Sequence, residues 1–241
     1  MICMNKDSLN EILYEQLEKQ FHEIQDRIYV PLFKQYADYL DLYRRGEFID
    51  LNGANIEEEI GEKASDITAV NPYSNFIDTH PLNEHECIAY LKKELRSCLF
   101  DPDVQPQMIK SGAMEIGYDW YFHYDSGINF FKQELSFPII AEPRFLYHEL
   151  PPGHYTGFAK GPDFSGVWPD CSELIDEADE EHELLQLGYE LMHFYEYQSR
   201  LFLHKAFKEM DVAGEFSEIE KRPFPIYIAE HDCEEMTLYV L

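Results

Sequence analysis

The stretch DEADEEHELLQLGYELMHFYEYQSRLFLHKAFKEM, residues 176–210, decides the fold. It opens with an acidic run and then becomes apolar at steps of three and four residues, which places one side of every helical turn against a core. Asp170 or Ser172 can cap its start, and Gly214 follows its end. We therefore expect one long central helix over 176–210. Its main apolar stripe consists of Leu184, Leu187, Leu191, Phe194, Tyr195, Leu201 and Phe202.

An amphipathic pattern at the start of the chain predicts a second long helix. Ser8 with Glu11 forms a capping-box signature, and Gly46 is the expected stop. Pro31 lies inside this pattern, where it removes a backbone donor and crowds the preceding turn. We expect either a kink at Pro31 or two consecutive helices.

Two shorter helical patterns follow. Asn83 is a good N-cap for a helix that runs to Leu99, and Asp101-Pro102 ends it. Residues 50–82 are rich in glycine, proline and acidic side chains. This segment predicts a connection that contains a short helix near 56–64.

The pattern then changes to the alternation of a β-strand. Apolar and polar residues alternate over 114–124, and Asp125-Ser126-Gly127 supplies turn residues before a partner strand. Residues 150–170 contain four prolines and four glycines, which predicts a loop-rich region with one short strand. Further strands are expected over 128–135, 137–147, 225–230 and 236–241.

These elements predict an α+β fold, with N-terminal helices and an antiparallel sheet packed on the central helix 176–210. We expect a single domain over 1–241. Within it, 1–100 can form a helical N-terminal subdomain and 101–241 a subdomain that contains the sheet.

Composition limits the possible partners. The chain has 47 Asp plus Glu against 19 Lys plus Arg, a net charge of −28, with 45% hydrophobic residues. Such a charge repels nucleic-acid backbones and anionic membranes and attracts basic proteins. No basic leader and no apolar run of bilayer length occurs in the sequence, so we expect a cytoplasmic protein.

Several enzyme classes are poorly supported. The five cysteines are scattered, which disfavours a disulfide framework and a thiolate zinc site. No glycine-rich phosphate loop, no Gly-x-Ser-x-Gly elbow and no dinucleotide fingerprint occurs. We therefore expect a protein without enzymatic activity and without a cofactor.

One string nevertheless suggests chemistry. His148-Glu149-Leu150-Pro151-Pro152-Gly153-His154 resembles the His-Glu-x-x-Pro-Gly-His signature of a family of large, mostly helical zinc peptidases. The resemblance implies that His148 and His154 hold a zinc ion and that Glu149 handles the proton of its water. Glu190, Glu196 or His193 would be the further ligand. The alternative interpretation is a Pro-Pro-Gly turn between two incidental histidines.

Two other groups of polar residues have a functional and a structural interpretation. His182, His193 and His204 are spaced eleven apart, so a helix separates neighbours by roughly 16 Å and no two share a metal. His193 with Glu196 can form half of a two-helix metal site, although a hydrogen-bonded core histidine is the simpler interpretation. The polar side of strand 114–124 continues to Asp125, and its residues either bind a cation or are solvated charge: Glu115, Asp119, His123 and Asp125.

The acidic clusters give the leading hypothesis, an inhibitor or immunity-type protein that neutralises a basic protein such as a toxin nuclease. Aromatic residues can provide anchors beside the acidic patch, although we expect most of these rings to lie in the core: Tyr73, Phe76, Trp168 and Tyr227. A metal-dependent hydrolase that uses His148, Glu149 and His154, with zinc as its cofactor, is one alternative. A structural subunit of a larger assembly is another. The expected partner-binding residues are Asp176, Glu177, Asp179, Glu180, Glu181, Glu183, Asp232, Glu234 and Glu235.

Overall fold

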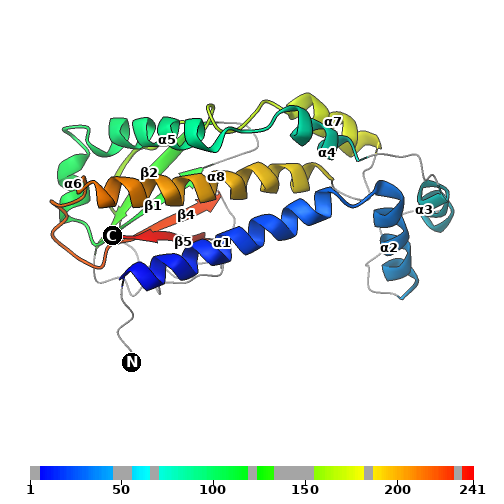
Figure 1. Cartoon of the computed structure of the whole chain (residues 1–241), viewed down its shortest axis with the longest axis horizontal. Helices are drawn as coiled ribbons and strands as arrows, with labels where there is room; N and C mark the ends of the chain where they lie inside the picture. Colours follow the sequence, from blue (N-terminus) through cyan, green and yellow to red (C-terminus); the bar gives the residue numbers. More distant parts are fainter. Residues whose placement is uncertain are drawn as a thin grey trace. The chain divides into compact units, whose positions relative to one another are not determined.

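The fold is α+β, as the sequence predicts, with helices and a five-stranded sheet (Figure 1). The computed structural model describes residues 6–45, 56–65, 71–118, 124–132, 155–181, 187–230 and 235–241. The helices are α1 (Lys6–Ile28), α2 (Leu32–Arg44), α3 (Ile56–Ser65), α4 (Pro72–Thr79), α5 (Glu84–Leu99), α6 (Gln105–Lys110), α7 (Ser172–Glu181) and α8 (Leu187–Val212). The strands are β1 (Ala113–Tyr118), β2 (Ser126–Phe131), β3 (Tyr155–Lys160), β4 (Pro225–Glu230) and β5 (Glu235–Val240).

The strand order in the sheet is β3-β2-β1-β4-β5. Neighbouring strands run antiparallel except β1 and β4, which run parallel. The expected antiparallel sheet is therefore a mixed sheet, with three antiparallel pairs and one parallel pair among the described strands. The chain places β2 and β3 on one side of β1 and then crosses through α7 and α8 before it adds β4 on the other side, so β4 enters in the same direction as β1.

The chain divides into two compact units, each described here by itself. The first unit comprises Met1–Phe21, Leu82–Pro169 and Tyr195–Leu241, and it holds the whole sheet. The second comprises His22–Pro81 and Asp170–Phe194. In the second unit, α2 and α3 share a core cluster of Tyr36, Leu40 and Ile60.

Helices cover one face of the sheet in the first unit (Figure 1). Met114, Ile116 and Tyr118 of β1 are buried, and the Tyr118 side chain reaches α8. On β5, Asn10 of α1 bonds the backbone N–H and carbonyl of Val240, each at 2.9 Å. The side chain of Asn10 thus satisfies the backbone N–H and C=O of Val240, which the edge strand β5 would otherwise leave without partners in the sheet.

Proline and capping residues set the helix boundaries as expected. Pro31 is the N-cap of α2, so the first long pattern forms two consecutive helices. Asn83 caps α5 by accepting a hydrogen bond from the backbone of Glu86 at 3.2 Å. Gly214 has a φ of +78°, a left-handed conformation that suits glycine after a helix.

The central stretch 176–210 is described as two helices, α7 and α8, where we expected one. Residues 182–186 between them lie outside the described part of the chain. Two short helices, α4 and α6, were also not expected. The strand predicted over 137–147 lies outside the described residues, whereas β3 supplies the short strand expected within 150–170.

The C-terminal hairpin is confirmed, because β4 and β5 pair antiparallel and Leu241 exchanges both backbone hydrogen bonds with Phe224. Among the described helices, none combines the length and the apolarity needed to cross a bilayer.

Candidate functional site

The polar side chains of the first unit gather where the parallel strands β1 and β4 end. Tyr118 and Glu230 are the last residues of these strands and lie opposite each other in the register. The strand order reverses between β1 and β4. The carboxyl ends of these two neighbouring parallel strands therefore lie side by side.

A cavity of about 300 Å³ lies on the face of the sheet opposite α8. Residues alternate between faces along a strand, so Tyr118 points to the helix and Glu115 and Gly117 to the other side. The cavity is lined by Glu115, Gly117, Tyr118, Asp125, Ser126, Gly127, Asn129, Phe158, Ala229 and Glu230. We call it the Glu115 cavity.

Glu115 is the unusual residue in this lining. Its side chain is only 2% exposed, although it is an acid in the middle of a strand. Asn129, its register partner on β2, donates to Glu115 Oε1 at 3.3 Å. Burial raises the pKa of Glu115, and the bond from Asn129 only partly opposes that rise. Among the described residues, Asn129 is the one donor to this carboxyl, and Oε2 receives no hydrogen bond.

Two glycines make room beside the carboxyl. Gly117 and Gly127 lie opposite each other on β1 and β2. A Cβ on Gly117 would lie 3.4 Å from Glu115 Oε1, and a Cβ on Gly127 would lie 2.8 Å from the Phe158 ring. Side chains at these positions would fill the cavity from its floor.

The rim of the cavity is acidic and aromatic. Phe158 on the edge strand β3 is 69% exposed, which is unusual for a ring of this size. Asp125 is exposed and forms an ion pair with Lys160 at 2.9 Å. Glu230 closes the rim from β4. Among the described residues, the lining therefore carries three carboxyl groups and no basic side chain.

On the helix-covered face, the same strand ends hold a buried ion pair. Arg200 and Glu196 of α8 bond each other, and the Tyr118 hydroxyl donates to Glu196 and accepts from Arg200 Nη2 at 2.8 Å. The guanidinium also lies over the Tyr197 ring, 4.7 Å from its centroid. Burial raises the pKa of Tyr118 well above its ordinary value. This network joins β1 to α8 and supports the floor of the site.

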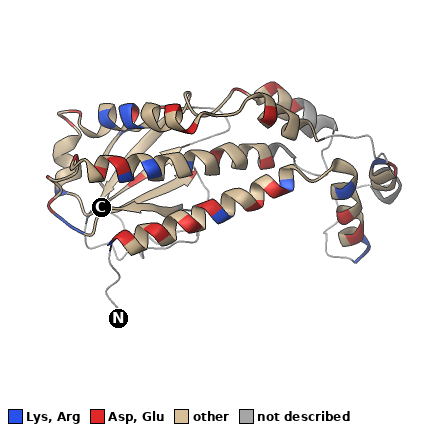
Figure 2. Ribbon diagram, viewed as in Figure 1, with Lys and Arg blue, Asp and Glu red and all other residues tan. Residues whose placement is uncertain are grey.

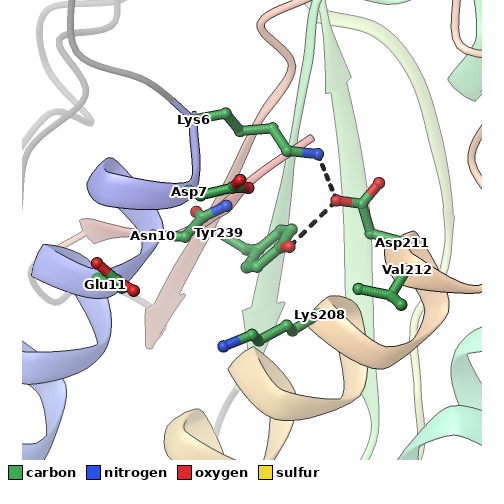
Figure 3. Close-up of a pocket in the computed structure, with 8 residues that line it drawn as sticks. All are labelled: Lys6, Asp7, Asn10, Glu11, Lys208, Asp211, Val212 and Tyr239. Carbon is green, nitrogen blue, oxygen red and sulfur yellow. Dashed lines mark hydrogen bonds and ion pairs between the residues drawn. The ribbon is translucent and has the colours of Figure 1, made fainter.

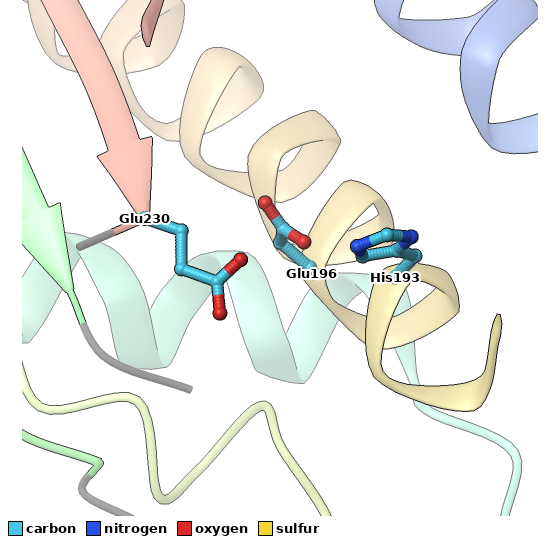
Figure 4. A group of neighbouring side chains, drawn as sticks. All are labelled: His193, Glu196 and Glu230. Carbon is cyan, nitrogen blue, oxygen red and sulfur yellow. The ribbon is translucent and has the colours of Figure 1, made fainter. Parts of the chain in front are cut away.

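A group of possible metal ligands lies beside this network (Figure 4). His193 and Glu196 on α8 and Glu230 on β4 offer ligand atoms within 4.8 Å of one another. The His193–Glu196 pair singled out in the sequence thus has Glu230 as a neighbour. Glu196 already has its positive partner in Arg200, so an ion there would share this carboxylate with a guanidinium.

A larger cavity of about 410 Å³ between α1 and the end of α8 has a different character (Figure 3). Lys6 binds Asp211 at 2.5 Å, and the Tyr239 hydroxyl donates to the same carboxylate at 3.1 Å. Lys208 adds a second positive charge to the lining. Asp211 therefore has a basic partner within the protein, and the lining of this cavity carries two lysines, unlike that of the Glu115 cavity.

Several of the site residues expected from the sequence lie outside the described residues. This applies to His148, Glu149, His154, His182, Asp119, His123, Glu183, Asp232 and Glu234. Asp176 is exposed on α7; Glu177, Asp179, Glu180 and Glu181 belong to α7 and Glu235 begins β5, without described side chains. The acidic patch therefore stays a prediction.

Tyr73, Trp168 and Tyr227 are buried in the core, as expected for most of the candidate aromatic anchors, so these three rings are not available to a partner. Phe158 is exposed instead, and the sequence analysis missed it together with Asn129. His204 is a hydrogen-bonded core histidine, since it is buried and its Nδ1 lies 2.7 Å from the Leu238 carbonyl oxygen.

Comparison of the chain with protein-family models, with curated proteins and with solved structures found no match.

Proposed function

We propose that this protein is an acidic binding protein that captures a basic protein and blocks it by occlusion, as an inhibitor or immunity-type partner does. A toxin nuclease is the class of target we favour, because its nucleic-acid-binding surface must be basic. The observation that carries the proposal is the Glu115 cavity, whose lining holds a buried carboxyl with an unfilled acceptor beside two other acids.

The distribution of charge supports the same function. The net charge of −28 would accelerate the encounter with a positively charged partner. Figure 2 shows Asp and Glu along the length of α1, and in the first unit Asp7, Glu11 and Glu15 of this helix are exposed. At spacings of four residues they lie on one side of the helix. An acidic surface of this kind steers a partner, while the cavity provides a specific contact.

Affinity capture from native cell extract, followed by mass spectrometry, tests the proposal. We expect the immobilised protein to retain a basic protein that elutes at about 1 M salt, where charges are screened within about 3 Å. Glu115→Gln should retain much less of it, because the buried carboxylate is removed without a change of shape.

Glu220→Gln is the matched control, since Glu220 is exposed outside the cavity and the substitution makes the same change of charge. It should retain the partner as the wild type does. Retention of no basic protein, or equal loss with both substitutions, would contradict the proposal.

A further inference from the structure

We propose that the Glu115 cavity receives the guanidinium group of one arginine side chain of the partner. This inference rests on the proposed function and specifies its contact. It makes the cavity a socket for a single side chain, in addition to the general attraction between acidic and basic surfaces.

Glu115 has fewer hydrogen-bond donors around it than its carboxylate can accept. A carboxylate can accept about four hydrogen bonds, and Glu115 lines the cavity, so a group that enters the cavity can donate to it. Among the described residues, Glu115 receives only the 3.3 Å bond from Asn129. An incoming group with several N–H donors and a positive charge supplies what Glu115 lacks.

The volume of the Glu115 cavity suits a single side chain. A cavity of about 300 Å³ is at the lower end of the range for ligand sites, which suits one side chain better than a folded segment. Gly117 and Gly127 let a flat group approach the backbone of β1 and β2 closely. The floor is therefore shaped for a planar head group.

The acceptors and the aromatic ring of the lining favour a guanidinium group over an ammonium group. Guanidinium carries five donors in a fixed plane and stacks on aromatic rings, whereas ammonium is a compact point charge. Asn129 Nδ2 donates to Glu115, so its Oδ1 is left as a second acceptor next to the carboxyl. The exposed ring of Phe158 belongs to the residue opposite Asn129 on β3. The carboxylate of Glu115 and the Oδ1 of Asn129 can accept from the planar N–H donors of a guanidinium group, and the Phe158 ring can stack on its plane.

Lys160 is the internal competitor at the rim. Its ion pair with Asp125 joins two exposed side chains, so an incoming guanidinium can displace it at small cost. Removal of Lys160 should therefore leave Asp125 available and strengthen binding.

The test uses three small probes that need no partner: the N-acetyl methylamides of arginine, lysine and citrulline. Binding is followed by NMR shifts of the cavity residues and by calorimetry. We expect the arginine probe to bind the wild type at millimolar concentration, the lysine probe several-fold more weakly and the neutral citrulline probe not at all. Glu115→Gln should weaken arginine binding about tenfold, as expected for loss of a charge-assisted hydrogen bond.

Two exposed positions and one control complete the design. Phe158→Ala should weaken binding of the arginine probe, and Lys160→Gln should strengthen it, each about threefold or more. Glu220→Gln should change nothing. Glu115→Gln should melt no lower than the wild type, because it removes a buried charge.

The inference is overturned if the arginine probe shifts no cavity residue, if lysine binds as tightly, or if Glu115→Gln and Phe158→Ala leave the affinity unchanged. Should a basic protein still be captured in that event, only the socket fails and the proposed function stands. Should the probe bind while no basic protein is captured, the socket stands and the proposed function fails.

Discussion

At the residue scale, the burial of Glu115 makes it a candidate binding residue rather than a solvated surface charge. Alternation along β1 correctly places Glu115 on the face opposite Tyr118, and solvated charge was one interpretation of that face. The structure buries it, because β1 is the central strand of five and Glu115 lies low in the cavity between its neighbouring strands. The alternation of residues along a strand predicts on which face of the sheet a side chain lies, but it does not predict how deeply that side chain is buried. Phe158 and Asn129 could not be predicted as its neighbours, since strand pairing brings them there.

His204 provides a pH test at the same scale. Burial lowers the pKa of His204 from 6.5 to about 4, and Lys205 and Lys208 add to that effect. A depressed histidine pKa stabilises the fold at pH above 6.5, and this contribution is lost as the pH falls through 4. The contribution is on the order of 3 kcal/mol for a shift of this size.

We expect the free energy of unfolding to fall between pH 7 and pH 4 by about this amount more in the wild type than in His204→Asn. Asn can still donate to the Leu238 carbonyl, which His204 Nδ1 contacts. Urea denaturation at the two pH values measures the difference. The same pH dependence in both proteins would contradict the assignment.

At the scale of elements, start and stop signals predicted α1, α2 and α5 well because each depends on local chemistry. The helix α4 was missed although its signal is present. Asn71 caps it by accepting from the backbone of Tyr73, and Pro72 occupies its first turn. Proline at this position favours a helix start, so Pro72 marks a helix rather than the irregular connection expected for 50–82. The parallel pairing of β1 and β4 depends on the crossover and leaves no local signal in either strand.

The contact of α8 with β1 gives the prediction at this scale. Arg200→Met should destabilise the protein by about 3 to 5 kcal/mol, because it leaves the buried carboxylate of Glu196 without its positive partner. The double substitution Glu196→Met with Arg200→Met should recover much of the loss. Chemical denaturation of the three proteins measures this. A single-substitution cost below about 1 kcal/mol would show that the pair does not hold α8 on the sheet.

At the scale of the whole molecule, the charge predicts association more than it predicts structure. A net charge of −28 was readable from composition, but its distribution was not. The described cations are largely engaged with acids, as in the pairs of Lys92 with Glu209, Arg96 with Glu215 and Lys205 with Glu84. Under the proposed function, the excess of acids attracts the basic partner. The account combines this general attraction with one specific socket.

The pKa of Glu115, followed by the NMR shift of its carboxyl carbon, tests the central claim most directly. Without ligand, burial should hold this pKa above its ordinary value of 4.5. Asp125 and Glu230 in the lining and Lys160 at the rim also titrate, so the carbon of Glu115 itself must be observed. With the arginine probe bound, the positive charge should lower the pKa of Glu115. A pKa that is the same with and without the probe would contradict the account.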